Sequence, residues 1–400
     1  MNAEHFDLYT DYLISSFGPT TATGLSALLE GQLSHDQVTR LLSSDPKNRA
    51  DLWKVVKPLV RAVESDDATI SIDDSISEKP HTDENDIIAW HWSHSFERHV
   101  KGLEFLTAYY QVASVSLPIA FDIVEKTEQY VDQKTDKAKR RSPLTKNQRY
   151  LMLLRVAAHN QVKFRYVLND VWFASADNMK YVKTTLNKDF MMPLKSNRKV
   201  ALSENGKRSG RYAAVSTLDL PENTPREVWL ETVPFPLLLL KQSFKNEDGS
   251  TGVRYLVTSD LTLSHDQMSK LFQKRWGIEV YHKSRKQNAS LEKSPTRTET
   301  TQRNHLFASL CAYIKLERLR IKTKQSHFAL KSKLYLSAVQ SAFSELVNLR
   351  FADLPSRKRN WISLMDGKPN YGVSTAARAS GRDAFALSAV AENAGAATAG

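Results

Sequence analysis

Residues 272–286 place one acidic side chain among basic and aromatic ones. If this segment is helical, four of its residues fall within an arc of about 60°, at about 100° per residue. They are Phe272, Arg275, Glu279 and Lys286. That helix face suits a site where the carboxylate holds a metal ion and its neighbours hold phosphates. The alternative is a solvated helix whose charges form ion pairs four residues apart.

Further carboxylates follow two predicted strands. Asp73 and Asp74 close an alternating apolar run. Asp170 follows a second apolar run, at 162–168. Carboxylates at adjacent strand ends, joined by Glu279 from a helix across them, can converge. Their repulsion would require a cation, and oxygen ligands favour Mg²⁺ or Mn²⁺. Two such ions, about 4 Å apart, would clamp the oxygens of a phosphoryl displacement. Turn or cap roles are the alternative for these aspartates.

The elements that must position these residues begin with helices and continue with strands. Residues 1–66 show helical apolar spacing, and two short helices around Gly31 resemble a helix-turn-helix. Plain helical packing is the alternative for that segment. The next predicted elements are strands at 69–74, 87–92 and 111–123, a mobile basic loop at 124–141, a helix at 146–161 and a buried strand at 162–168.

The second half of the chain alternates short strand patterns with turn signals and then becomes helical. Residues from 375 onward are rich in Ala, Gly and Ser, which predicts a disordered tail. The predicted elements are strands at 213–218, 228–233, 236–244 and 253–259, and helices at 264–287, 300–321 and 330–348.

The net charge, the cysteine content and the length of apolar runs restrict the classes of function that the chain can have. The formal charge of +12 over 400 residues favours a polyanionic partner, with nucleic acid ahead of a membrane surface, although many basic proteins bind neither. The single cysteine, Cys311, excludes a disulfide framework and a thiolate metal site, and it predicts a small buried residue in a reducing cytosol. The N-terminus lacks signal-peptide features, and the longest apolar run, 233–240, is too short to span a membrane.

Together these segments resemble the bacterial insertion-sequence DDE transposases, over roughly residues 68–320. The helix matches their Y-(2)-R-(3)-E-(6)-K signature at every spacing, with Phe272 at the tyrosine position. Residues 70–75 resemble the first acidic block of that family. Residues 166–173 resemble the second block, in which an Asp ends a strand ahead of an aromatic pair. Lys195 and Arg198 belong to a further similar block.

The resemblance implies a mixed α/β fold: a ribonuclease-H-like sheet flanked by helices, with a β-rich insertion and an N-terminal helical domain. It implies Asp, Asp and Glu as ligands of two Mg²⁺ ions, which Mn²⁺ could replace. Successive strand residues face opposite sides, so only one of Asp73 and Asp74 can be a ligand. Asp74, directly before Ser75, is slightly favoured.

The resemblance also implies DNA contacts. Phe272, Arg275 and Lys286 would hold DNA-end phosphates, although Phe lacks the tyrosine hydroxyl. Trp229 is the candidate for stacking on a flipped base, and a packed strand residue is its alternative.

The expected activity is cut-and-paste transposition: hydrolysis at transposon ends, then strand transfer of the 3′-OH. Alternatives are a nuclease or resolvase without strand transfer, and a non-catalytic DNA-binding relative.

Expected partners are double-stranded DNA, as terminal inverted repeats and target, and a second copy in a synaptic homodimer. The expected location is the bacterial cytoplasm, at the nucleoid when DNA is bound. The expected domains are 1–66 (helical, DNA-binding), 67–189 and 263–325 (catalytic core), 190–262 (insertion), 326–374 (helical) and 375–400 (tail).

Overall fold

The computed structural model describes residues 2–93, 97–133, 136–246 and 248–352. Its contacts divide the chain into two units, Met1–Lys331 and Ser332–Gly400. The predicted tail at 375–400 lies outside the described residues. Within the described ranges, none of the helices is long and apolar enough to cross a membrane.

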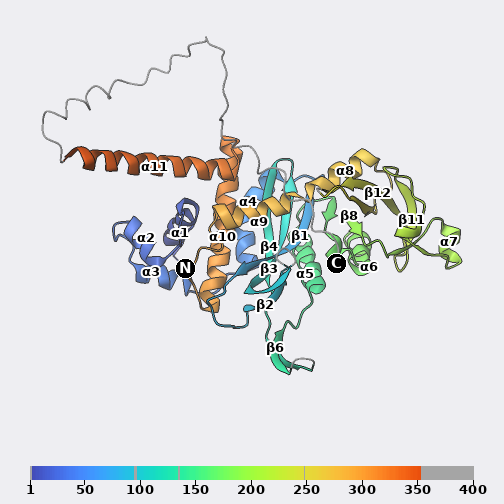
Figure 1. The fold of residues 1–400 in the computed structure, drawn as a ribbon, viewed down its shortest axis with the longest axis horizontal. Coiled ribbons are helices and arrows are strands. Elements are labelled where there is room, and N and C mark those ends of the chain that lie inside the picture. Colours follow the sequence, from blue (N-terminus) through green and yellow to red (C-terminus); the bar gives the residue numbers. More distant parts are fainter. Residues whose placement is uncertain (1, 94–96, 134–135, 247, 353–400) are drawn as a thin grey trace, which may run out of the picture. The chain divides into compact units, whose positions relative to one another are not determined.

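The centre of the first unit is a mixed sheet (Figure 1). Strand β1 (Thr69–Glu78) runs antiparallel to β3 (Arg98–Val112), which also pairs with β4 (Val115–Ile123). On its other side β1 runs parallel to β7 (Tyr166–Leu168), and β7 runs parallel to β8 (Asp189–Leu194). This mixed sheet, flanked by helices, confirms the fold class expected from the sequence.

The insertion extends the same sheet, because its last strand pairs antiparallel with β8. The result is an 11-stranded sheet that runs from β10 to β2. The strands that the insertion adds are β13 (Thr251–Thr258), β12 (Leu237–Lys245), β11 (Arg226–Leu230), β9 (Lys199–Ala201) and β10 (Ala213–Ala214). At the opposite edge of the sheet, β2 (Ile88–Ser93) pairs with β3.

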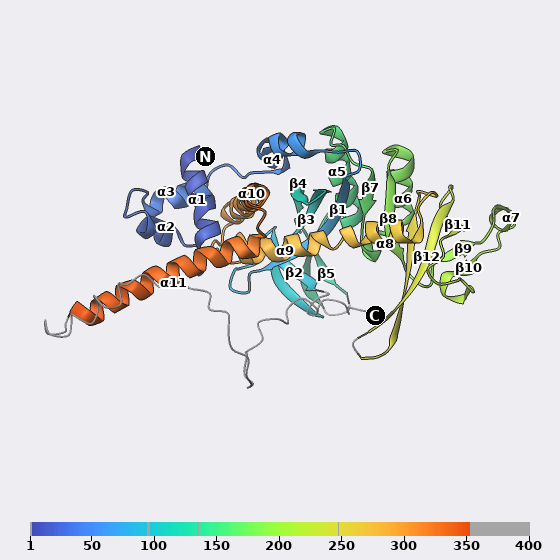
Figure 2. The ribbon, with the colours of Figure 1, turned by 90° about the horizontal axis from the view of Figure 1, so that it is seen from above.

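Helices cover both faces of the central strands. Figure 2 shows α4 (Arg49–Val63) and α5 (Lys146–His159) on one side of the sheet and α9 (Gly277–Asn288) on the other. A capping box starts α5, since the Thr145 side chain and the Gln148 side chain each accept the other's backbone N–H. The remaining helices of the insertion and core are α6 (Ala176–Lys180), α7 (Glu204–Arg208) and α8 (His265–Lys274).

The helices predicted within 1–66 are present, and three of the four pack on a long helix, α10 (Glu299–Thr323). The hydroxyl of Tyr9 lies 2.9 Å from Nδ1 of His305. The Asn304 side chain donates to the Leu42 carbonyl at 2.9 Å. Cys311 is buried in α10, as predicted. The other helices are α1 (Ala3–Ser15), α2 (Ala22–Leu28), α3 (His35–Leu42) and, after α10, α11 (His327–Ala352).

Several predictions about the β-rich part were wrong. The strand predicted at 213–218 covers only β10 before a 3₁₀ turn at Val215–Thr217, and the strand predicted at 162–168 begins only at Tyr166. The segment 111–123 is not one run: it contains the end of β3, a turn at Ala113 with a positive φ, and β4. The basic segment 124–141 is not only a loop, because it contains the hairpin β5 (Glu128–Asp132) and β6 (Lys137–Arg141). Opposite charges pair across that hairpin, as Arg141 does with Glu128 at 2.8 Å, so its strands form without an apolar face.

Candidate active site

The helix predicted over 264–287 is interrupted, which corrects the expectation of one continuous face. Arg275 and Trp276 form a tight turn between α8 and α9, with each N–H bonded to the carbonyl three residues earlier. Just after the turn, Gly277 lies close to the sheet. A Cβ on Gly277 would lie 2.9 Å from the hydroxyl oxygen of Tyr109 on β3. The glycine thus allows α9 to pack closely against the sheet.

Asp73 faces α9. The strand was predicted to end at Asp73 and Asp74, but β1 continues to Glu78 in antiparallel pairing with β3. Residues directly opposite in such a pair share a face. Asp73 lies opposite Thr107, whose hydroxyl accepts from the Tyr281 hydroxyl of α9 at 3.5 Å. His282, also on α9, has its Nε2 3.8 Å from the Asp73 carboxylate. Asp73 and α9 therefore share one side of the sheet.

Asp74 faces the opposite side, toward α5. Its carboxylate accepts from Lys146 Nζ at 3.0 Å. The same ammonium group lies 2.6 Å from Glu104 on β3, and the other oxygen of Glu104 lies 2.8 Å from Nδ1 of His91 on β2. Burial alone would raise the pKa of Glu104, but the hydrogen bond from His91 and the charge of Lys146 lower it to about 2. This buried group keeps Asp74 on the α5 side.

Asp170 follows β7 and caps a short turn, Val171–Phe173. Its carboxylate accepts from the backbone N–H of Trp172 at 3.0 Å and of Phe173 at 3.3 Å. The parallel pairing of β7 with β1 ends at Leu168 opposite Ser71, so the next residues of both strands bring Asp170 toward Asp73. The expected Asp after a strand is therefore also a cap residue.

Burial disfavours the ionised forms of all three aspartates. Burial raises the pKa of Asp73 well above its usual value, and the charges of Asp74 and Asp170 raise it further. Burial likewise raises the pKa of Asp74, against the attraction of Lys146, and it raises the pKa of Asp170. Close carboxylates of this kind favour binding a cation or a proton.

Glu279 pairs with Arg275, with 2.8 Å between its carboxylate and the guanidinium. The guanidinium carbon of Arg275 lies 5.6 Å from the centroid of the Phe272 ring, and its charge opposes the raised pKa of Asp73. Lys286 lies apart from this group: its Nζ is 3.3 Å from the Ile76 carbonyl and 2.8 Å from Glu292. Three of the four predicted side chains thus touch, and Arg275 links them electrostatically to Asp73.

The donor chemistry of these residues fits a divalent cation, because carboxylates are the ligands that Mg²⁺ prefers and their mutual repulsion is relieved by it. The arrangement is not a closed cage. Across the described residues, no three His, Cys, Asp or Glu side chains lie in a geometry ready to hold one metal ion. Glu279 would have to leave Arg275 to join Asp73 and Asp170.

Lys146, Glu104 and His91 did not stand out in the sequence. A lysine directly after a helix cap is common on surfaces, and Glu104 lies inside a strand whose neighbours are apolar. The one available signal was the position of Glu104, since an acidic residue buried in a central strand requires partners.

Replacing Lys146 by methionine is expected to lower the free energy of unfolding at pH 7 by about 2 kcal/mol, because buried Glu104 loses a charged partner. The Glu104 pKa is lowered on folding, so this stability is present above the unfolded pKa and is lost as the pH falls toward 2. The difference from wild type should therefore shrink in acid. Urea unfolding measures it, with Lys54→Met, at a 77% exposed side chain, as the control. Equal stability of the two variants would contradict the role of Lys146.

The remaining predicted DNA ligands are spread over the insertion. Trp229 lies on β11, partly buried, and is separated from β7 by β12, β13 and β8 in the sheet order. Arg198 lies in the turn after β8, where its N–H donates to the Lys195 carbonyl at 3.0 Å. Lys195 itself reaches back toward the acidic residues, with its Nζ 5.7 Å from the ring centroid of Trp172.

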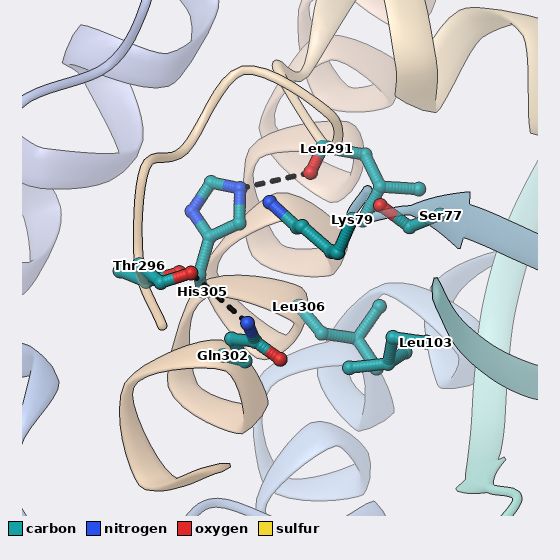
Figure 3. A pocket seen from close by; sticks show the side chains of 8 residues that line it. All are labelled: Ser77, Lys79, Leu103, Leu291, Thr296, Gln302, His305 and Leu306. Atoms are coloured by element: carbon teal, nitrogen blue, oxygen red, sulfur yellow. Dashed lines mark hydrogen bonds between the residues drawn. The ribbon is translucent and has the colours of Figure 1, made fainter. Parts of the chain in front are cut away.

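A small pocket beneath β1 plays no part in this arrangement. It has a volume of about 10 Å³, room for about one water molecule, between Lys79 and the side chains of α10 (Figure 3). His305 and Gln302 are held there by the backbone carbonyls of Leu291 and Thr296. Burial lowers the pKa of Lys79, which donates to the Ser294 carbonyl at 2.7 Å.

Comparison with known proteins gives a family-level match. Residues 2–229, more than half of the chain, match a family described as DDE superfamily endonuclease. This span includes Asp73, Asp74 and Asp170 and ends before α9. A solved structure, the Drosophila P element transposase strand transfer complex, is similar at 14% identity with a TM-score of 0.24. That similarity covers 47% of this chain and only 37% of the P element chain. No curated protein sequence matches this chain.

Proposed function

Because the chain belongs to the DDE superfamily of endonucleases, we propose that it is a transposase of the bacterial insertion-sequence branch with the Y-R-E-K signature. It cuts a phosphodiester at each element end and joins the freed 3′-OH to target DNA. The observation that carries the proposal is geometric: Asp73 lies on the side of the sheet covered by α9, the helix that bears Glu279, and the parallel pairing of β1 with β7 brings Asp170 toward Asp73.

Asp73, Asp170 and Glu279 would hold two Mg²⁺ ions, for which Mn²⁺ could substitute. The sequence slightly favoured Asp74 as the first ligand, whereas the orientation of Asp73 toward α9 supports Asp73. When bound, such ions stabilise charge on phosphoryl oxygens and make water a better nucleophile. The chain's own contribution is positioning: Arg275 and Phe272 beside Glu279 hold the DNA end, and catalysis depends on alignment and charge.

The wider DNA path uses several predicted segments. We assign phosphate contacts to Lys286, Lys195 and Arg198, and base stacking to Trp229 in the insertion at 190–262. The helices of 1–66 would bind DNA before the core segments 67–189 and 263–325 act. The last two proposed domains are the helical region 326–374 and the tail 375–400. Residues beyond 352 lie outside the part of the chain that the structure describes.

The DNA partner would be double-stranded, both as terminal inverted repeats and as target. Cutting two ends requires two active sites, so we propose a homodimer in the synaptic complex. A net charge of +12 supports strong phosphate binding, with an affinity that falls steeply with salt.

The deciding experiment uses donor DNA made from the sequences that flank the coding region. Imperfect inverted repeats bracketed by a short direct duplication identify the element ends. With Mg²⁺, the purified full chain should nick or cut at those ends and then join the 3′-OH to a second DNA molecule. Cutting without joining would indicate a nuclease or resolvase, and binding without cutting would indicate a non-catalytic relative.

Mg²⁺ is expected to raise the thermal stability of the metal-free protein. A ligand at tenfold its dissociation constant stabilises the folded state by about 1.4 kcal/mol, which corresponds to a few degrees in melting temperature. The raised pKa of Asp170 means that protons compete for the site, so the shift should grow with pH. Differential scanning fluorimetry measures it against NaCl of equal ionic strength. An equal shift with NaCl, or with Asp170→Asn protein, would contradict metal binding there.

A further inference from the structure

An open pocket of about 410 Å³ lies beside the acidic residues, lined by Thr145, Lys146, Asn147, Trp172 and Lys195. Its side chains come from the start of α5, the turn after β7 and the segment after β8. The Trp172 side chain is 50% exposed. The ammonium group of Lys195 lies 5.7 Å from the centroid of the indole ring.

This pocket is joined to Asp170, a proposed metal ligand, and to Asp74, the neighbour of the proposed ligand Asp73 on β1. Lys146, on its wall, is bonded to Asp74 at 3.0 Å. Trp172 donates its backbone N–H to the Asp170 carboxylate at 3.0 Å. A molecule held in the pocket therefore lies close to Asp170 and Asp74.

Its chemistry selects one kind of ligand. A half-exposed indole offers a flat apolar face, and the ammonium group of Lys195 offers positive charge within the same pocket. Aromatic side chains stack on nucleobases of any sequence, and lysines neutralise the phosphates on either side. The pocket volume falls in the range of small-molecule sites, about 300–1,000 Å³. A paired base keeps its faces inside the duplex, so only an unpaired base can use the indole.

We propose that this pocket binds one unpaired nucleotide of the DNA strand next to the scissile phosphate, with its base on Trp172 and its phosphate on Lys195. The assignment of that strand rests on the proposed function. It gives Trp172 a stacking role separate from that of Trp229, which is far along the sheet order. Lys195 is long and flexible enough to move from the ring to a phosphate when the base arrives.

The test measures binding of the full chain to fluorescent oligodeoxythymidylate and to a duplex of equal length, in EDTA so that no strand is cut. Trp172→Ala should weaken single-strand binding about tenfold, and Trp172→Phe should retain most of it. Duplex binding should change little. Trp90→Ala is the matched control, because that tryptophan is 52% exposed and lies on the edge strand β2.

Salt dependence separates stacking from charge. Lys195→Gln should lower the slope of log affinity against log salt by about 0.7, the value for one phosphate contact on a single strand. Trp172→Ala should leave that slope unchanged, since a stacked ring releases no counterion.

Several results would overturn the inference. One is single-strand binding that Trp172→Ala leaves unchanged, or weakens only as much as Trp90→Ala does. Another is displacement of the oligonucleotide by thymidine monophosphate at similar concentrations, which would indicate a site for free nucleotides. Failure of the proposed function is distinguishable. Trp172-dependent binding by a chain that never cuts DNA would refute the transposase alone, and normal cleavage with Trp172-independent strand binding would refute the pocket alone.

Discussion

Asp73→Asn is expected to reduce Mg²⁺-dependent DNA cleavage at least about 10³-fold, because a neutral carboxamide cannot replace a charged ligand beside the reacting phosphate. The same change should stabilise the metal-free protein. The pKa of Asp73 is raised on folding. The folded state therefore loses stability as the pH rises through the folded pKa and Asp73 becomes ionised. Asparagine removes that cost. Cleavage of end-labelled donor DNA and thermal unfolding at pH 7 measure the two effects.

Asp74→Asn is the matched comparison, since the two residues are adjacent on β1 and face opposite sides. We expect it to cost far less cleavage than Asp73→Asn, because Lys146 holds Asp74 on the side of α5. Asp170→Asn serves as the positive reference and should abolish cleavage. If Asp74→Asn abolished cleavage while Asp73→Asn cut normally, Asp74 would be the ligand and the side-chain directions of β1 would differ in the active protein.

Glu317→Ala is expected to lower the free energy of unfolding by about 3–5 kcal/mol, because it leaves buried partners without their carboxylate. Glu317 is fully buried on α10. It accepts from the Ser116 backbone N–H of β4 at 2.6 Å, from Arg320 at 2.6 Å, and it lies 3.0 Å from Nε2 of His327. His327 in turn lies 2.9 Å from the Ser284 hydroxyl of α9. The carboxylate thus ties the sheet to the helix that bears Glu279.

The pH dependence gives a second measure of Glu317. Burial alone would raise its pKa, but the hydrogen bonds from His327, Arg320 and Ser116 lower it overall. Its contribution is therefore present above the unfolded pKa and is lost as the pH falls through the folded one. Guanidinium unfolding at pH 7 and in acid should show the gap to wild type closing in acid. Glu204→Ala, which removes an exposed pair with Arg208, should change stability by less than about 0.5 kcal/mol.

Much of the local structure followed from the sequence. Helix starts were predictable where a cap and its partner are three residues apart, as at Ser34 and Ser264, because that contact is local. Short apolar runs between turn signals predicted β12 and β13 to within a few positions. The hairpin at 128–141 was missed because its strands are held by cross-strand charge pairs, which apolar periodicity does not register.

For the candidate site, the sequence by itself determined which residue types were present and that Asp73 and Asp74 must face opposite sides of a strand. The ion pair of Arg275 with Glu279, four residues apart, was the alternative that the sequence left open for this helix face. Only the tertiary structure decided that α9 covers the side of Asp73 and α5 the side of Asp74. The same holds for Lys195 and Trp172, which meet beyond the ends of the neighbouring strands β8 and β7. Such contacts depend on how layers pack, and packing joins residues that no local spacing connects.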